Sequence, residues 1–352
     1  MIIETNQSLE SYCKELSKKK IVFMDTEFDR RSTYFSKLSF ITISDGRKTN
    51  IIDCLQKKLS LNPLEKIISN KKITKVFHGS QQDLEIFNNL KIKIKSIFDT
   101  QVAAQFCGYE QPISYSTAVL NICKVKINKD LQNSDWLKRP INQKIKEYLK
   151  NDVKFLKKIF NYFYKILKKN KNLEYFREEM QQINNKNEVI SSSILRKKIN
   201  NETIAKKNFQ KLMQLREKIA CSKNLPKNWI FQDEQILNII KNQDFEKIVK
   251  NNNLTKNEKK IIVKIFKTIK IIKKKSYNIN ILNILSIYRS EVSQKYKIAE
   301  QLIASKNDLN NFISSGFEKK SKWRKKLFFK TAKKILKKQV TIKIKKDQIY
   351  FN

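Results

Sequence analysis

The residues best suited to chemistry are isolated acids at the ends of apolar segments, in a chain that is otherwise strongly basic. Asp25 and Glu27 come directly after the apolar run 21–24, which predicts a buried strand. Residues i and i+2 of an extended chain point to the same side, so we expect both carboxylates to face one site. Asp83 lies at the start of a helix predicted after a second apolar run, 73–77. Strand ends therefore supply three candidate acids.

A fourth acid and a tyrosine lie on a later predicted helix. Tyr148 and Asp152 are four residues apart and so share one helix face. Four carboxylates without neutralising partners repel one another, and two divalent cations would balance their charge. Carboxylate ligands favour Mg²⁺ or Mn²⁺, and two ions about 3.5–4 Å apart can activate a water and stabilise the leaving oxygen of a phosphodiester. The alternative is that these acids are structural, because a DxE or a helical YxxxD alone is common.

The elements that must position these acids alternate between strands and helices. We expect strands at 21–24, 38–44, 49–53, 73–77 and 97–98, and helices at 63–69, 80–90, 101–107 and from Pro140 to about residue 160. Asp45-Gly46 between two alternating segments predicts a hairpin. This mixed order predicts an α/β domain over residues 1–170.

After residue 170 the strand signals fade and the chain becomes rich in Lys, Ile and Asn. We expect a helical linker over 171–204, a helical domain over 205–285 and a second, basic helical domain over 286–352. The alternation in 339–351 also predicts a strand near the C-terminus.

Composition excludes several classes of site in this chain of 352 residues. It contains one histidine, His78, which excludes HExxH and Cys₂His₂ zinc sites, and four glycines without a phosphate-binding loop motif. Its five cysteines form no CxxC pair, which indicates reduced thiols in a cytosol. No apolar run is long enough to span a membrane and the N-terminus does not resemble a signal peptide, so we expect a cytoplasmic protein without a membrane partner.

The net charge of +42 indicates a polyanionic partner, but the charge has a second possible origin. Lysines outnumber arginines 66 to 9, so part of the basicity can reflect A/T-rich codons and solvated helix faces. The distribution is more informative. Residues 318–346 contain 14 basic residues and one acid, Glu318, which favours a phosphate-binding surface.

The order of these motifs resembles the DEDD superfamily of 3′–5′ exonucleases, in its tyrosine-bearing branch, and within it the ribonuclease D family. The segments that carry the likeness are 22–43 (VFMDTEFDRRSTYFSKLSFITI), 75–87 (KVFHGSQQDLEIF), 98–108, 113–120, 128–140 (NKDLQNSDWLKRP) and 147–156 (EYLKNDVKFL). Residues 215–239 resemble an HRDC domain, and 297–313 with 322–328 resemble a second. The likeness covers nearly the whole chain and implies a ribonuclease H-like exonuclease domain, a mixed sheet flanked by helices, followed by all-α HRDC domains.

The resemblance also implies a role for each candidate residue. Asp25 would bridge two metal ions, Glu27 and Asp152 would help hold the ion that carries the attacking water, and Asp83 would serve the second ion. Tyr148 would orient the water, since a phenol of ordinary pKa near 10 is a poor base. The products would be nucleoside 5′-monophosphates released from a 3′ end.

Four neighbours of these acids are candidate substrate contacts: Thr26, Phe28, His78 and Gln82. Phe28 can stack on a terminal base or pack in the core, and His78 can contact substrate or be a packed residue. We expect structural roles for Trp136 and Arg139, and a core position for Trp229 in the helical bundle.

The function that follows is a metal-dependent exoribonuclease that trims RNA 3′ ends, with tRNA precursors as the substrate that the resemblance implies. A DNA exonuclease of the same superfamily remains open, because a 2′-OH contact cannot be read from sequence. A non-catalytic nucleic-acid-binding protein is the third interpretation, disfavoured by the intact acids. We infer no protein partner and expect a monomer.

Overall fold

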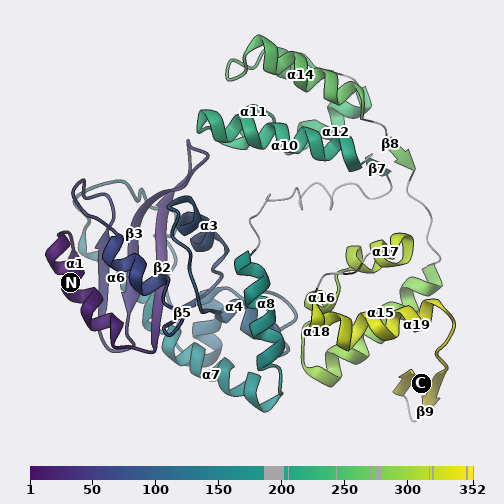
Figure 1. Cartoon of the computed structure of the whole chain (residues 1–352), viewed down its shortest axis with the longest axis horizontal. Helices are drawn as coiled ribbons and strands as arrows, with labels where there is room; N and C mark the ends of the chain where they lie inside the picture. The colour runs from purple at the N-terminus through teal and green to yellow at the C-terminus, as the bar shows by residue number, and fades with distance from the viewer. Residues whose placement is uncertain are drawn as a thin grey trace. The chain divides into compact units, whose positions relative to one another are not determined.

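The computed structural model describes residues 1–185, 202–204, 206–242, 244–269, 271–273, 279–316, 318, 321–345 and 348–351. The chain forms two compact units, shown in Figure 1. Unit 1 comprises Met1–Glu27, Leu38–Lys186 and Tyr277–Asn352, and unit 2 comprises Phe28–Lys37 and Asn187–Ser276. The chain therefore contributes to unit 2 twice, first through the short segment Phe28–Lys37.

A six-stranded mixed sheet forms the centre of unit 1. Its strands are β1 (Ile2–Ile3), β2 (Ile21–Asp29), β3 (Lys37–Ser44), β4 (Thr49–Asp53), β5 (Thr74–Phe77) and β6 (Ile97–Asp99), in the order β1-β4-β3-β2-β5-β6. β2, β5 and β6 run parallel, whereas β3 and β4 form the antiparallel hairpin predicted around Asp45-Gly46. The α/β prediction is confirmed. β1, which pairs with β4, is too short to have been predicted.

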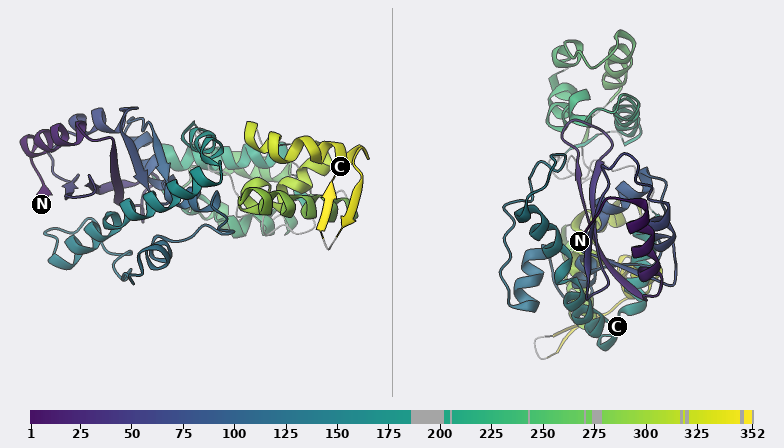
Figure 2. Two further views of the ribbon diagram at one scale, coloured as in Figure 1. Left: turned by 90° about the horizontal axis from the view of Figure 1, so that it is seen from below. Right: turned by 90° about the vertical axis from the view of Figure 1, so that its left-hand side faces the viewer.

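Helices cover both faces of this sheet, with α1 on one side and α6 on the other in Figure 2. They are α1 (Asn6–Ser17), α2 (Asn62–Ile68), α3 (Gln81–Asn89), α4 (Thr100–Gln105), α5 (Tyr115–Ala118), the π-helical turn η1 (Val119–Cys123), α6 (Gln143–Lys154), α7 (Leu156–Lys169) and α8 (Leu173–Asn185). α1 was not predicted. It buries Leu9, Tyr12, Cys13 and Leu16, whose i, i+3, i+4, i+7 spacing is typical of an amphipathic helix, so the sequence contained a signal that the prediction overlooked.

The single helix predicted after Pro140 is wrong, because two helices, α6 and α7, meet at Phe155. A tyrosine hydroxyl explains the break. The hydroxyl of Tyr115 donates to the carbonyl of Asn151 at 2.9 Å and accepts from the amide of Phe155 at 3.2 Å. In an unbroken helix that amide would bond that carbonyl, so the tyrosine is inserted into the helical hydrogen-bond ladder.

The C-terminal helices belong to unit 1. They are α15 (Ile279–Tyr296), α16 (Glu300–Ile303), α17 (Lys306–Ser315), α18 (Lys322–Arg324), the π-helical turn η2 (Lys325–Phe329) and α19 (Lys330–Leu336), followed by the antiparallel strands β9 (Ile342–Lys345) and β10 (Gln348–Phe351). Trp323, Phe328 and Phe329 are buried in the same apolar core as the helices that flank the sheet. Arg324 forms a buried ion pair of 2.6 Å with Glu179 of α8. One strand was predicted within 339–351, whereas the structure has two strands there, β9 and β10, which pair with each other.

Unit 2 is a small helical domain. It contains α10 (Lys206–Lys223), α11 (Lys227–Ile230), α12 (Asp233–Asn242), α13 (Glu246–Val249) and α14 (Lys256–Lys267), together with the short paired strands β7 (Glu202–Ile204) and β8 (Ile271–Lys273). The expected core position of Trp229 is wrong: its side chain is 46% exposed, and its neighbours Ile230 and Phe231 fill the core instead.

The segment 28–37, which includes the end of β2 and the start of β3, is fixed within unit 2 by hydrogen bonds. The hydroxyl of Tyr34 donates to Glu217 at 2.7 Å, and the amides of Tyr34 and Phe35 both donate to the side-chain oxygen of Asn224 at 3.1 Å. The strand that bears Asp25 and Glu27 therefore leads directly into a loop anchored on the helical domain.

In the described part of the chain, no helix is long and apolar enough to cross a membrane.

Candidate active site

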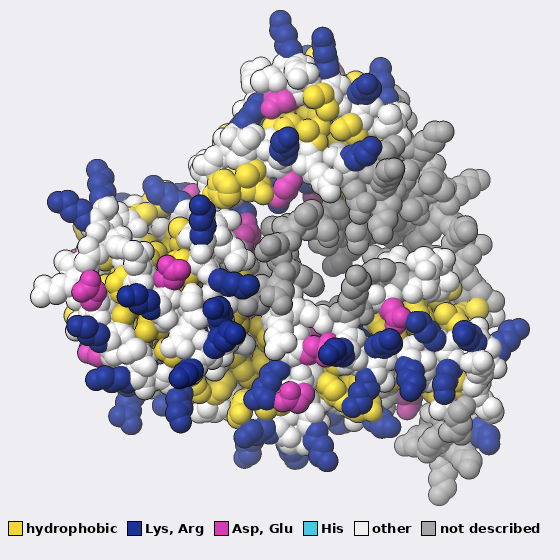
Figure 3. Space-filling model, viewed as in Figure 1, with side chains coloured by type: hydrophobic (Ala, Val, Ile, Leu, Met, Phe, Trp, Pro, Cys, Tyr) yellow, Lys and Arg dark blue, Asp and Glu magenta, His cyan; other side chains and the backbone are white. Residues whose placement is uncertain are grey.

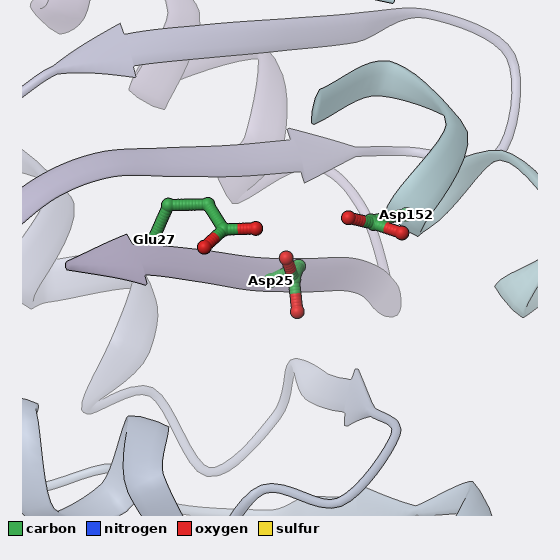
Figure 4. A group of neighbouring side chains, drawn as sticks. All are labelled: Asp25, Glu27 and Asp152. Atoms are coloured by element: carbon green, nitrogen blue, oxygen red, sulfur yellow. The ribbon is translucent and has the colours of Figure 1, made fainter. Parts of the chain in front are cut away.

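Three of the candidate acids meet between strand β2 and helix α6. Asp25 and Glu27 lie two residues apart on β2, and Asp152 lies on α6; one carboxylate oxygen of each falls within 4.8 Å of the others. Figure 4 shows the three side chains directed toward the same space. Strand alternation brings the first two together. The side-chain cap of Asn142 on the amide of Ile145 fixes the start of the helix that supplies the third.

Asp83 lies next to this group and is held by Thr26. The hydroxyl of Thr26 donates to the buried carboxylate of Asp83 at 2.6 Å, which joins β2 to the first turn of α3. The negative charge of Asp83 also contributes to raising the pKa of Asp25. The structure therefore brings together Asp25, Glu27 and Asp152, with Asp83 as an adjacent fourth acid.

The loop before α3 is held by Asp99, which the sequence did not single out. Its carboxylate accepts from the amides of Gly79 and Ser80 at 2.9 and 2.7 Å, and from the Ser80 hydroxyl at 2.8 Å. Gly79 has φ +78°, a conformation that side-chain-bearing residues rarely adopt. This loop sets where Asp83 begins its helix.

Lys129 is the site residue that sequence reasoning missed. Its ammonium donates to Asp152 at 2.5 Å and lies 5.2 and 5.3 Å from the ring centroids of Tyr115 and Tyr148. The positive charge lowers the pKa values of Asp25, Glu27 and Asp152 against the other influences on them. The available signal was its place in the segment 128–140 that carries the family likeness.

Burial and mutual repulsion dominate the acid–base properties of the cluster. Burial, followed by the charges of Asp152 and Glu27, holds the pKa of Asp25 well above its usual range. Burial and the charge of Asp152 raise the pKa of Glu27 to about 9. Burial raises the pKa of Asp83 to about 7 despite the hydrogen bond from Thr26. The folded chain therefore favours protons, or another positive charge, among these acids.

Tyr148 lies beside the cluster as a protonated phenol. Burial, then the charge of Asp152, raises its pKa above the ordinary value near 10, and its hydroxyl is hydrogen-bonded to Asp152. Its ring packs against Trp136, with centroids 5.8 Å apart. At neutral pH the hydroxyl can donate a hydrogen bond and cannot act as a base.

The donor set suits a hard divalent cation. Asp25, Glu27 and Asp152 offer only carboxylate oxygens, the ligands that Mg²⁺, Mn²⁺ and Ca²⁺ prefer. A bound cation would remove the mutual repulsion that raises the pKa values of these acids. The residues present therefore fit a metal ion at this position.

The four candidate substrate contacts lie in different environments. Thr26 is buried and donates a hydrogen bond to Asp83. Phe28 is half-buried and belongs to unit 2, whereas Gln82 is exposed on α3. Both ring nitrogens of His78 are used within the fold, by the hydroxyl of Thr100 at 2.8 Å and the carbonyl of Ile113 at 2.9 Å. Because a carbonyl only accepts, Nε2 carries a proton and donates it to Ile113, and burial lowers the pKa of His78.

Trp136 and Arg139 have the structural roles expected of them. Arg139 donates to both carboxylate oxygens of buried Asp53, at 2.7 and 2.8 Å, and lies 4.0 Å from the ring centroid of Phe40. The carbonyl of Trp136 accepts from the hydroxyl of Ser39. These contacts attach the segment before α6 to the central sheet.

Comparisons with known proteins show what this chain is similar to. Residues 1–168 match the family model of a 3′–5′ exonuclease domain. The chain is 28% identical to the ribonuclease D of Jannaschia sp. (strain CCS1) over 378 aligned positions, covering 99% of this chain and 98% of that protein. It is 27% identical to the ribonuclease D of Bartonella henselae, covering 96% and 90%.

A solved structure has the same fold over almost the whole length. The crystal structure of Escherichia coli RNase D, described as an exoribonuclease involved in structured RNA processing, superposes with a TM-score of 0.73 and 21% identity. The superposition covers 96% of this chain and 98% of that one. The likeness therefore extends beyond the exonuclease domain into the helical C-terminal half.

Proposed function

The chain belongs to the ribonuclease D family of 3′–5′ exonucleases, and from this premise we propose that it removes nucleotides from RNA 3′ ends by hydrolysis at the Asp25, Glu27 and Asp152 cluster. The observation that carries the proposal is the convergence of three carboxylates and the Tyr148 hydroxyl at one place. Asp83 completes the site from α3. The products are nucleoside 5′-monophosphates.

The side chains divide the work of the reaction between them. Asp25 would bridge two divalent ions, Mg²⁺ or Mn²⁺, with Glu27 and Asp152 on the first and Asp83 on the second. Bound there, such ions supply a water of lowered pKa and stabilise charge on the leaving oxygen. Tyr148 stays protonated, and its hydroxyl beside Asp152 would orient the attacking oxygen.

The substrate is RNA, and tRNA precursors are the class we propose within it. The net charge of +42 favours a polyanion. In Figure 3, lysine and arginine side chains are spread over the visible face of both units and outnumber the acids. Thr26, Phe28, His78 and Gln82 are proposed to border the bound 3′ end, His78 by holding the loop before Asp83. We further propose a cytoplasmic monomer.

The domain assignment remains part of this proposal. We assign residues 1–170 to the exonuclease domain, 171–204 to a helical linker, 205–285 to an HRDC domain and 286–352 to a second, basic HRDC-like domain. Residues 186–201 of the linker, and Lys319, Lys320 and Lys346 of the basic segment, lie outside the described residues.

The test is digestion of matched 5′-labelled RNA and DNA oligonucleotides by the full chain. The expected result is a ladder shortened one nucleotide at a time from the 3′ end of RNA, abolished by EDTA and restored by Mg²⁺ or Mn²⁺. A substrate blocked with a 3′-phosphate controls for internal cutting. Faster digestion of DNA would favour the DNA exonuclease, and binding without cleavage would favour a non-catalytic protein.

A further inference from the structure

Lys129 forms an ion pair with one of the three acids that would hold a metal ion. Its ammonium lies 2.5 Å from Oδ1 of Asp152, one of the three acids that converge. The side chain of Lys129 is 29% exposed and that of Asp152 only 7%. The ion pair therefore lies at the border of the site, with the carboxylate inside it.

The ammonium of Lys129 lies over two aromatic rings. Tyr115 and Tyr148 place their ring centroids 5.2 and 5.3 Å from the nitrogen, within the range of cation–π attraction. Tyr115 is fixed by its insertion between α6 and α7, and Tyr148 by packing on Trp136. The rings are thus held in place independently of the lysine.

The backbone that bears Lys129 is fixed locally as well. The side-chain amide of Asn128 donates to the carboxylate of Asp130 at 2.7 Å, and the amide of Asp130 donates back to Asn128 at 2.7 Å. The amide of Gln132 donates to the carbonyl of Lys129 at 3.0 Å. This compact turn holds Lys129 facing the acids.

We propose that Lys129 is the resident cation of the metal-free site, and that it gives up Asp152 when a divalent ion binds. The proposal rests on the metal site proposed above. A divalent ion held by Asp25, Glu27 and Asp152 puts two further positive charges a few ångströms from the ammonium, and charges of one sign at that distance repel even in a high dielectric. Metal loading is therefore an exchange of cations, and Lys129 sets the affinity of the site.

The first arm of the test is metal affinity. Mg²⁺ binding to the full chain is measured by calorimetry at pH 9, where protons compete least for the acids. Lys129→Met keeps a long apolar side chain and removes the charge, and we expect it to bind Mg²⁺ about tenfold more tightly than wild type. Lys129→Arg keeps the charge and should stay within about threefold. Lys126→Met, an exposed lysine of the same loop, is the control for net charge.

The second arm is thermal stability with and without saturating Mg²⁺. Because coupling between two ligands is reciprocal, loss of the resident cation should lower the melting temperature of the metal-free protein and leave the metal-bound protein close to wild type. The rise caused by Mg²⁺ should therefore be larger in Lys129→Met than in wild type or in Lys126→Met. A lysine with a merely structural role would lower both melting temperatures equally.

The outcomes separate this inference from the proposed function. Wild-type protein that binds no Mg²⁺ would overturn both. Wild-type protein that binds, with Lys129→Met binding equally or more weakly, would overturn the role of Lys129 alone and leave the catalytic site intact.

Discussion

The acidic side chains of the candidate site repel one another, and a bound metal ion would reduce that repulsion. Asp25, Glu27 and Asp152 approach within 4.8 Å, and Asp83 adds a fourth acid beside them. Lys129 offsets part of this charge. Folding without metal therefore raises the proton affinity of the site, and metal binding must displace those protons.

We expect the stability of the metal-free protein to fall as pH rises from about 5, just above the ordinary pKa of a carboxyl group, to about 9. The pKa of Glu27 is raised to about 9 and that of Asp83 to about 7, so the folded state binds more protons here than the unfolded state, and deprotonation destabilises it. Saturating Mg²⁺ should flatten this decline. The readout is the difference between melting curves with and without metal, because Lys75, whose pKa burial lowers to about 7, affects both curves. Parallel curves would argue against metal at these acids.

Replacing Tyr148 by phenylalanine should lower turnover by about 10- to 1,000-fold while Mg²⁺ affinity stays near wild type. Only the hydroxyl that orients the attacking oxygen is lost, and the ring still packs on Trp136. Single-turnover cleavage and calorimetry measure the two effects separately. Turnover equal to wild type would show that the tyrosine is only structural.

The acids could be predicted from sequence because local periods relate them. Asp25 and Glu27 follow from strand alternation, and Tyr148 and Asp152 from helix periodicity. Lys129 could not be predicted, since it reaches an acid 23 residues further along the chain from a turn without a period. The bond from Thr26 to Asp83 spans 57 residues and was likewise out of reach.

At the scale of elements, tertiary hydrogen bonds decide where strands and helices end. The strand predicted at 21–24 continues to Asp29 as β2, beside its sheet neighbour β3 and beyond the stretch Ile21–Phe23 that pairs with β5. The break between α6 and α7 depends on a hydroxyl that lies 36 residues before the carbonyl it bonds. Secondary-structure propensity along the chain predicts neither the end of β2 nor the break between α6 and α7. The boundaries of the elements were therefore less predictable than their existence.

The attachment of the segment before α6 to the sheet should matter for both stability and rate. Arg139→Met leaves the buried carboxylate of Asp53 without its partner, and we expect a loss of about 2–4 kcal/mol in the free energy of unfolding. Turnover should also fall, because α6 carries Tyr148 and Asp152. Urea unfolding and cleavage rates measure these effects.

The matched control for Arg139→Met is Arg177→Met. Arg177 pairs with Glu174 on the surface of α8, where both side chains are largely exposed, so we expect a change within about 0.5 kcal/mol. Equal losses in the two variants would mean that the bond to Asp53 contributes little to the position of α6.

At the scale of the whole molecule, the basic C-terminal segment is both a surface and part of the core. Trp323, Phe328 and Phe329 are buried in unit 1, and the charge of Arg324 is neutralised by its buried ion pair with Glu179. Deleting the segment would therefore remove core residues together with the charge. The sequence predicted the charge but not the burial, because the apolar residues are dispersed among lysines.

Substituting exposed lysines tests the surface without disturbing this core. We expect a variant with Lys325, Lys330, Lys334 and Lys337 changed to Gln to bind single-stranded RNA more weakly. The slope of log K against log salt should flatten by up to about 3, at about 0.7 for each phosphate that a lysine no longer neutralises. The control changes four exposed lysines of the N-terminal part, Lys14, Lys18, Lys57 and Lys66, to Gln. Equal slopes in the two variants would remove the C-terminal segment from the RNA-binding surface.

The most direct test of the central claim is the Asp25→Asn variant in metal-dependent cleavage of RNA from its 3′ end. Loss of this carboxylate removes charge from the centre of the cluster, so cleavage should fall at least about a thousandfold while RNA binding and the melting temperature in metal-free buffer are retained. Asp29→Asn, on the same strand but outside the cluster, is the matched control and should cleave within about threefold of wild type. Near-normal cleavage by Asp25→Asn would contradict the assignment of catalysis to this site.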